Sequence, residues 1–120
     1  MSTRNWRDLI TGMNGAVKGL RTASPDVMKA FGDMSRAAHG VGKERGGPAL
    51  DHATQELIAL AISVATRCEP CIAYHAEGAL QAGATRDQVA ETLALAVYMG
   101  AGPSVMYAAK ALEAVDQLSG

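Results

Sequence analysis

Residues 56–75 read ELIALAISVATRCEPCIAYH, and the interpretation of the whole chain starts from this stretch. It contains both cysteines of the protein, Cys68 and Cys71, in a C-x-x-C spacing, and His75 follows four positions after Cys71. An apolar segment that opens at Glu56 leads into them. Two thiols and an imidazole at the end of an apolar run are the part of the sequence with evident chemistry, so these residues form the candidate site.

A helix that begins after Cys68 would bring the thiols and the imidazole together. At about 100° per residue, Cys68, Cys71 and His75 fall within one sector of roughly 60°. Cys71 and His75 are then i,i+4 neighbours, close enough for the imidazole to accept the thiol proton. The thiolate is the reactive form of cysteine, and both the helix dipole and a neighbouring histidine lower a thiol pKa from its free value of about 8.5.

Two points stay open when only the sequence is considered. The dipole favours Cys68 as the more reactive thiol because it is nearer the helix N-terminus, whereas proximity to His75 favours Cys71. Helical periodicity also does not determine whether the chain folds back to place Glu56 beside His75.

The same residues have simpler interpretations. A C-x-x-C pair can be half of a zinc site, but structural zinc takes four ligands, and the chain has no second C-x-x-C and no H-x3-H. A purely structural disulfide is unusual in a cytosolic protein. Taken alone, His75 would be interpreted as a core histidine and Glu56 as a solvated helix residue. His39 and His52 have no visible partner in the sequence, and we interpret them as ordinary polar residues. The joint spacing favours redox chemistry, and we expect neither a metal nor another cofactor.

Apolar periodicity and helix-capping signals predict an all-α single domain of about six helices. The apolar residues are mostly Ala, Leu, Val and Met, and only 4% of all residues are aromatic, which favours close-packed helices over strands. Ser24-Pro25, Asp51 and Thr85 are typical helix starts, and Gly83 is a typical stop. The predicted helices span about 4–22, 25–38, 52–66, 69–82, 86–99 and 104–118.

Each predicted helix has an apolar face that should be buried. In the 25–38 helix the residues expected to face inward are Val27, Met28, Phe31 and Met34. The 52–66 and 86–99 helices are apolar nearly all round, and a domain of this size has limited interior in which to bury them. Leftover apolar surface usually marks an interface, so we expect a homo-oligomer.

Length and charge exclude several classes of function. The 120 residues fit one domain spanning 1–120, and a net charge of −1 gives no electrostatic case for binding nucleic acid or an anionic membrane. No apolar run reaches the roughly 18 residues that a membrane span requires. The N-terminus, MSTRNWRDLI, has charges where a signal peptide needs its apolar core. We therefore expect a cytoplasmic protein.

The order of a glutamate, an apolar run, C-x-x-C, three residues and a histidine resembles the alkyl hydroperoxidase D-like / carboxymuconolactone decarboxylase-like family. The similarity continues through Ala79, Gly83 and the segment TRDQVAETLALAVYMGAGPSVMYAAKALE. It covers about 50–115 and leaves 1–48 as an N-terminal helical extension. The resemblance implies an alkyl hydroperoxidase D-like helical bundle that assembles into trimers or hexamers.

The resemblance also implies a chemistry for the candidate site. Cys71 would be the thiol that attacks a small hydroperoxide, Cys68 the resolving thiol, and Glu56 and His75 a proton relay. A thioredoxin-like or lipoyl-bearing dithiol would restore the pair, without a cofactor. Some peroxidase members carry a second histidine between the cysteines, where this chain has Pro70.

Two alternatives to a peroxidase stay open. One is a decarboxylase- or lactone-type enzyme of the same fold, although the family's decarboxylases generally lack the C-x-x-C. The other is a non-catalytic redox-sensing or interaction protein, in which formation of the disulfide alters contacts within an oligomer.

Overall fold

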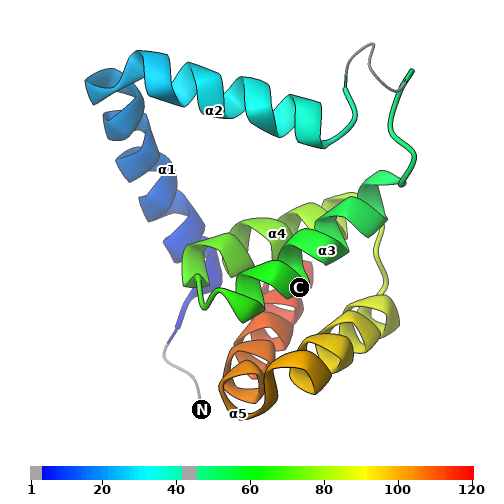
Figure 1. The fold of residues 1–120 in the computed structure, drawn as a ribbon. Coiled ribbons are helices and arrows are strands. Elements are labelled where there is room, and N and C mark those ends of the chain that lie inside the picture. Colours follow the sequence, from blue (N-terminus) through cyan, green and yellow to red (C-terminus); the bar gives the residue numbers. More distant parts are fainter. Residues whose placement is uncertain (1–3, 42–45) are drawn as a thin grey trace.

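A computed structural model describes residues 4–41 and 46–120, and within these ranges the chain is helical and contains no strand. Its five helices are α1 (Trp6–Ala23), α2 (Pro25–Ala38), α3 (His52–Ala65), α4 (Glu69–Gln81) and α5 (Arg86–Ser119) (Figure 1). The predicted all-α class is confirmed. The first four helices also begin and end within about two residues of the predicted bounds, which is the usual uncertainty of helix ends.

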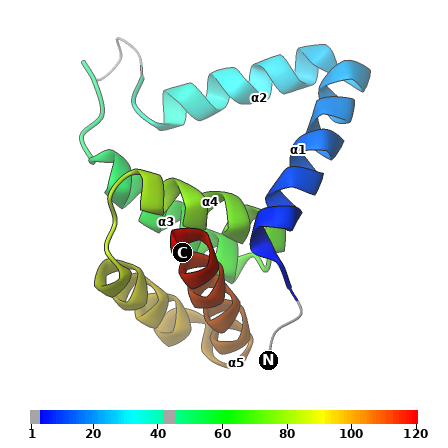
Figure 2. The ribbon, with the colours of Figure 1, turned by 180° about the vertical axis from the view of Figure 1, so that it is seen from behind.

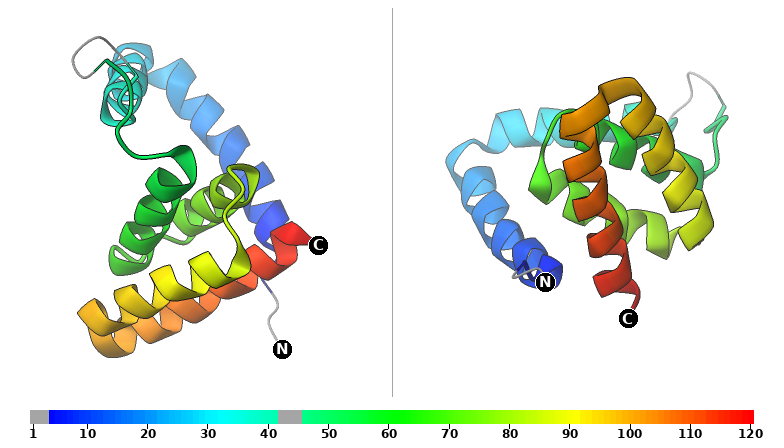
Figure 3. Two further views of the ribbon diagram at one scale, coloured as in Figure 1. Left: turned by 90° about the vertical axis from the view of Figure 1, so that its right-hand side faces the viewer. Right: turned by 90° about the horizontal axis from the view of Figure 1, so that it is seen from below.

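The structure has five helices rather than the predicted six, because the predicted 86–99 and 104–118 helices run together as the two arms of α5 across one non-helical residue. The chain bends at Ala101, where φ is 54° and ψ is −137°, and the helix then resumes. Gly100 permits the bend, since a Cβ there would collide with the side chain of Ser104. Pro103 lies in the first turn of the second arm, where its missing N–H costs no hydrogen bond. Figure 3 shows the two arms diverging from the bend.

The hydrophobic core lies between α3, α4 and α5, and the start of α1 closes it. α3 and α4 run antiparallel to each other and lie across the arms of α5 (Figure 1). Trp6 is completely buried: its Nε1 donates to Glu113 Oε1 at 2.8 Å and its backbone N–H donates to Gln117 Oε1 at 2.9 Å. These bonds fasten the start of α1 to the second arm of α5, which lie beside each other in Figure 2.

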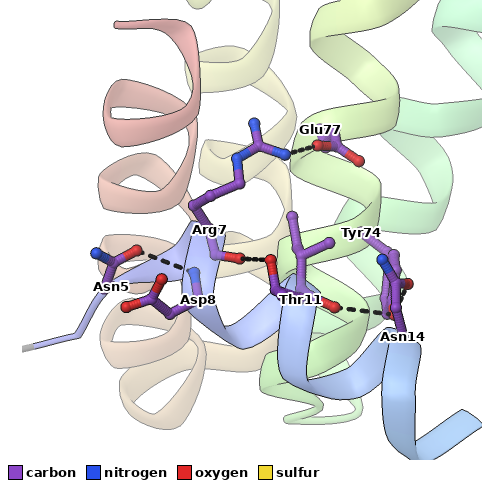
Figure 4. A network of polar contacts seen from close by, with 8 residues as sticks. Asn5, Arg7, Asp8, Thr11, Asn14, Tyr74 and Glu77 are labelled. Carbon is purple, nitrogen blue, oxygen red and sulfur yellow. Dashed lines mark hydrogen bonds and ion pairs between the residues drawn. The ribbon is translucent and has the colours of Figure 1, made fainter.

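Polar contacts attach the first half of α1 to α4 (Figure 4). Arg7 forms an ion pair with Glu77, and the hydroxyl of Tyr74 donates a hydrogen bond to Asn14 Oδ1. The buried residues of α1 also belong to this half, since Trp6 is followed only by Ile10. The second half of α1 therefore leaves the core and carries α2 away from it.

Most helix ends coincide with their predicted signals. The side chain of Asp51 accepts the N–H of Thr54 at 2.8 Å at the start of α3, and 85–88 form a complete capping box at the start of α5. Gly83 follows α4 with a φ of 91°, a conformation that glycine adopts at little cost. Ser24 precedes α2 as predicted, but its side chain makes no capping hydrogen bond.

The prediction that the apolar residues of α2 face inward is wrong within the single chain. Val27, Phe31 and Met34 are 69%, 57% and 60% exposed, and α2 has no buried residue. Among the described helices, α2 packs only against α1 (Figure 1). The radius of gyration of 15.0 Å accordingly exceeds the roughly 13.6 Å expected for a compact chain of this length. Periodicity identified the apolar face but not what covers it.

α5 is the one described helix that could cross a membrane by length and composition alone. The core helix of a globular protein passes the same test. α5 bends at Ala101 and packs against α3, α4 and α1, and 17% of its apolar 18-residue window is buried within the chain.

Candidate functional site

Cys68 and Cys71 lie at the junction between α3 and α4. Arg67, with a φ of 59°, turns the chain between the two helices, and Cys68 is the N-cap residue of α4. The backbone N–H of Cys71 donates to Cys68 Sγ at 3.2 Å. The two cysteines are joined by a disulfide, with their Cα atoms 5.2 Å apart. The C-x-x-C pair is therefore placed where a dithiol and a disulfide can interconvert within one helical turn.

Glu56 and His75 meet because α3 and α4 are antiparallel. Oε2 of Glu56 is 2.8 Å from Nδ1 of His75, although the residues are 19 positions apart in the chain. Glu56 is buried, with 8% of its surface exposed, whereas His75 is partly exposed. A carboxylate bound to Nδ1 places the hydrogen on that nitrogen and leaves Nε2 free to accept or donate a proton. This settles the point that periodicity left open.

All four residues predicted from the sequence thus lie on the α3–α4 hairpin. His75 follows Cys71 by one helical turn on α4, and Glu56 supports His75 from α3. The arrangement offers two thiols, a helix N-terminus and a carboxylate–imidazole pair, which together can form, stabilise and reprotonate a thiolate.

Gly78 is a residue of the site that the sequence analysis missed. A Cβ at position 78 would lie 2.5 Å from Oε2 and 2.7 Å from Cδ of Glu56, both shorter than van der Waals contact allows. The carboxylate therefore occupies the space that a side chain on α4 would fill. A glycine inside a helix costs about 1 kcal/mol relative to alanine, and that unexplained cost was the available signal.

His52 is the second residue that was missed, since the sequence showed no partner for it. It lies one turn before Glu56 on α3, and its Nε2 is 3.9 Å from Oε1 of Glu56. The spacing of four residues on one helix was the available signal. The carboxylate of Glu56 is consequently flanked by two imidazoles, His75 on one oxygen and His52 on the other.

Glu69, the residue after Cys68, is neutralised by two cations. Nζ of Lys110, on the second arm of α5, is 3.1 Å from one carboxylate oxygen, and Arg4 pairs with the other. An unpaired carboxylate beside the thiols would oppose thiolate formation, so these pairs reduce the repulsion. They also fix the first turn of α4 to the N-terminal segment and to α5.

The described part of the chain contains no group of three or more His, Cys, Asp or Glu side chains that could hold a metal ion. Both cysteine sulfurs are joined in the disulfide, so in this state neither is a thiolate ligand.

The chain is similar in sequence and in structure to known proteins. Residues 25–114 match the sequence model of the carboxymuconolactone decarboxylase family, and this range includes α2. The crystal structure of an apo carboxymuconolactone decarboxylase family protein from Legionella pneumophila is similar, with a TM-score of 0.87 and 39% identity. That similarity covers 96% of this chain and 97% of the Legionella chain.

Curated relatives extend the similarity over nearly the full length. An uncharacterized protein of Cupriavidus necator is 38% identical over 98% of both chains. An uncharacterized protein of Haemophilus influenzae is 38% identical over 92% of both chains. Sequence and fold are thus shared along the chain, with α1 and α2 included.

Proposed function

This chain belongs to the carboxymuconolactone decarboxylase family, and we propose that within it the protein is a thiol-dependent peroxidase for small hydroperoxides. The observation that carries the proposal is the 2.8 Å hydrogen bond between Glu56 and His75, one helical turn from a cysteine pair that forms a disulfide. A nucleophilic thiol, a proton acceptor and a resolving thiol are the groups that such a cycle requires.

The first step forms the reactive thiolate. Glu56 accepts the Nδ1–H of His75, so Nε2 of the same ring takes the proton from Cys71 Sγ. The thiolate attacks the terminal oxygen of the hydroperoxide and the O–O bond breaks. Cys71 becomes a sulfenic acid, and the alkoxide takes the proton from His75 and leaves as an alcohol.

The second step closes the disulfide. Cys68 attacks the sulfur of the Cys71 sulfenic acid, and the hydroxyl group leaves as water with the proton of the Cys68 thiol. The Cys71 N–H that donates to Cys68 Sγ, together with the helix N-terminus, stabilises Cys68 as a thiolate for this attack. The two thiols supply both electrons that reduce the hydroperoxide.

A separate dithiol then regenerates the pair by thiol–disulfide exchange. Both cysteines are partly exposed, which supports access by a thioredoxin-like protein or a lipoyl group. A reducing compartment such as the cytoplasm would supply that dithiol. The cycle needs no cofactor.

The exposed apolar surface supports a homo-oligomer. Besides Val27, Phe31 and Met34 on α2, it includes Ile58, Ile62, Leu95, Tyr98, Met99, Val105 and Met106 on α3 and α5. Contiguous apolar surface on a folded chain usually marks an interface with another chain. The family resemblance implies a trimer or a hexamer.

Titration of free thiols tests the peroxidase proposal. The reduced protein is treated with one equivalent of an organic hydroperoxide, and its thiols are counted before and after. We expect a fast loss of both thiols, recovery on addition of a dithiol, and no loss in Cys71→Ser. If both thiols persist in the unmodified protein, the peroxidase proposal is wrong.

A further inference from the structure

The carboxylate of Glu56 is held between two histidines and a helix backbone. Its Oε2 is 2.8 Å from Nδ1 of His75, and its Oε1 is 3.9 Å from Nε2 of His52. Gly78 closes another side, where even a Cβ would not fit. Each of its two oxygens thus has one imidazole nitrogen within 4 Å.

Burial makes the second imidazole important. A carboxylate that is 92% buried loses most of its hydration, so its oxygens depend on polar partners within the protein. His75 satisfies one oxygen. His52 lies beside the second oxygen. Its side chain is 63% exposed and lines a cavity of about 600 Å³, so His52 stands between that oxygen and the solvent.

We propose that His52 is a positioning residue of the thiol site. It holds the second oxygen of Glu56, which keeps the carboxylate directed at His75. At 3.9 Å the contact is longer than a direct hydrogen bond, and one bridging water molecule would complete it. His52 acts through Glu56 alone, so this inference rests on the proposed function and deepens it.

The consequence for Cys71 follows from the orientation of the relay. Glu56 directed at His75 accepts the Nδ1–H of that ring, so Nε2 is free to take the proton of the Cys71 thiol. Loss of the His52 contact therefore makes the Cys71 thiolate harder to form in the reduced protein.

The other charged and titratable groups around His52 have partners of their own. His39, at the end of α2, has its ring centroid 6.3 Å from that of His52. Nδ1 of His39 lies 2.7 Å from the carbonyl oxygen of Ser35. Arg36 forms an ion pair with Asp33, and the carboxylate of Asp51 accepts the N–H of Thr54. His39 is thus a suitable control, because it is a neighbouring histidine without a contact to Glu56.

The test measures thiol alkylation against pH in reduced protein that carries Cys68→Ser, so that Cys71 is the one thiol present. We expect His52→Ala to raise the pH midpoint of alkylation by about 0.5–1 unit and to slow alkylation near pH 7 about three- to tenfold. His52→Gln, whose amide can donate to Oε1 of Glu56, should restore most of the rate. His39→Gln should leave the midpoint unchanged.

A second background tests whether His52 acts through Glu56. In Glu56→Gln protein, His52→Ala should cause no further shift of the alkylation midpoint, because His52 acts on Cys71 only through the carboxylate of Glu56. An unshifted midpoint in His52→Ala, with or without a lower melting temperature, would overturn the proposal. A shift that persists in the Glu56→Gln background would do the same.

This design separates the two levels of the argument. If Glu56→Gln moves the midpoint and His52→Ala does not, the role of His52 is wrong while the relay of Glu56 and His75 stands. If neither moves it, the relay itself is wrong. Since no peroxide is used, the result is independent of which oxidant the protein reduces.

Discussion

Gly78 leaves the space that Glu56 occupies: a Cβ on residue 78 would lie 2.5 Å from Oε2 and 3.3 Å from Oε1 of that carboxylate. The same Oε2 is the atom that bonds to His75. The close approach of α4 to Glu56 thus depends on a residue without a side chain, at a helix position where alanine would otherwise be preferred.

Gly78→Ala should therefore displace Glu56 from His75. Steric strain of about 1–3 kcal/mol should exceed the gain of about 1 kcal/mol in helix propensity, so the free energy of unfolding should fall. Alkylation of Cys71 near neutral pH should also slow. Chemical denaturation and the alkylation rate measure the two effects.

Gly15→Ala is the matched control, since a Cβ there meets nothing within 4 Å on α1. It should stabilise the protein slightly without changing thiol reactivity. Equal behaviour of the two variants would show that Gly78 has no special role.

Cys68→Ser should separate the two chemical steps of the proposed cycle. Serine is a good N-cap residue, so α4 should still form. Cys71 should consume about one equivalent of hydroperoxide and stop as a sulfenic acid, because the resolving thiol is absent. Mass spectrometry after trapping with a sulfenic-acid reagent identifies the product. If Cys71→Ser reacts instead and Cys68→Ser does not, Cys68 is the attacking thiol.

Asp51 should make the stability of α3 sensitive to acid. The backbone N–H of Thr54, and to a lesser degree its side chain, hold the pKa of the Asp51 carboxyl below its usual value of 3.8. A lowered folded-state pKa means that the stabilisation is present above pH 3.8 and is lost as the pH falls through the lower value.

Asp51→Asn keeps an N-cap acceptor but removes the titration. The melting temperature of the unmodified protein should therefore exceed that of Asp51→Asn at pH 7, and the difference should shrink towards pH 2. Thermal unfolding at several pH values measures this. A difference that stays constant across that range would contradict the assignment.

The exposed face of α2 should be covered by another copy of the chain. Phe31→Glu introduces a charge into that face, so it should lower the mass in solution towards the 12.4 kDa of the monomer. Ala37→Glu adds the same charge about 120° around the exposed helix and should have little effect. Light scattering after size exclusion measures the mass. An unmodified protein that is already monomeric would refute the expectation.

The local parts of the fold could be predicted from the sequence because their signals are local. The caps at Asp51 and Thr85 and the stop at Gly83 were identified from the residue types that satisfy the first and last backbone groups of a helix. The i,i+4 spacing of Cys71 and His75 likewise depends on helical geometry alone.

Relations between helices could not be predicted in the same way. Periodicity found the apolar face of α2 but not its exposure, because a helix pattern does not say what packs against it. The roles of Gly78 and His52 depend on where α4 crosses Glu56, which is a tertiary contact. The bend at Ala101 was interpreted as a helix end because glycine and proline mark both features.

Trp6 is the single tryptophan of the chain, and it is sealed between the start of α1 and the second arm of α5. The tryptophan fluorescence of the protein therefore reports the separation of α1 from the second arm of α5 at that one place. α2 joins the other end of α1, away from the indole (Figure 1). Circular dichroism that is lost before the emission changes would accordingly come from helices away from the indole, among which α2 has no buried residue.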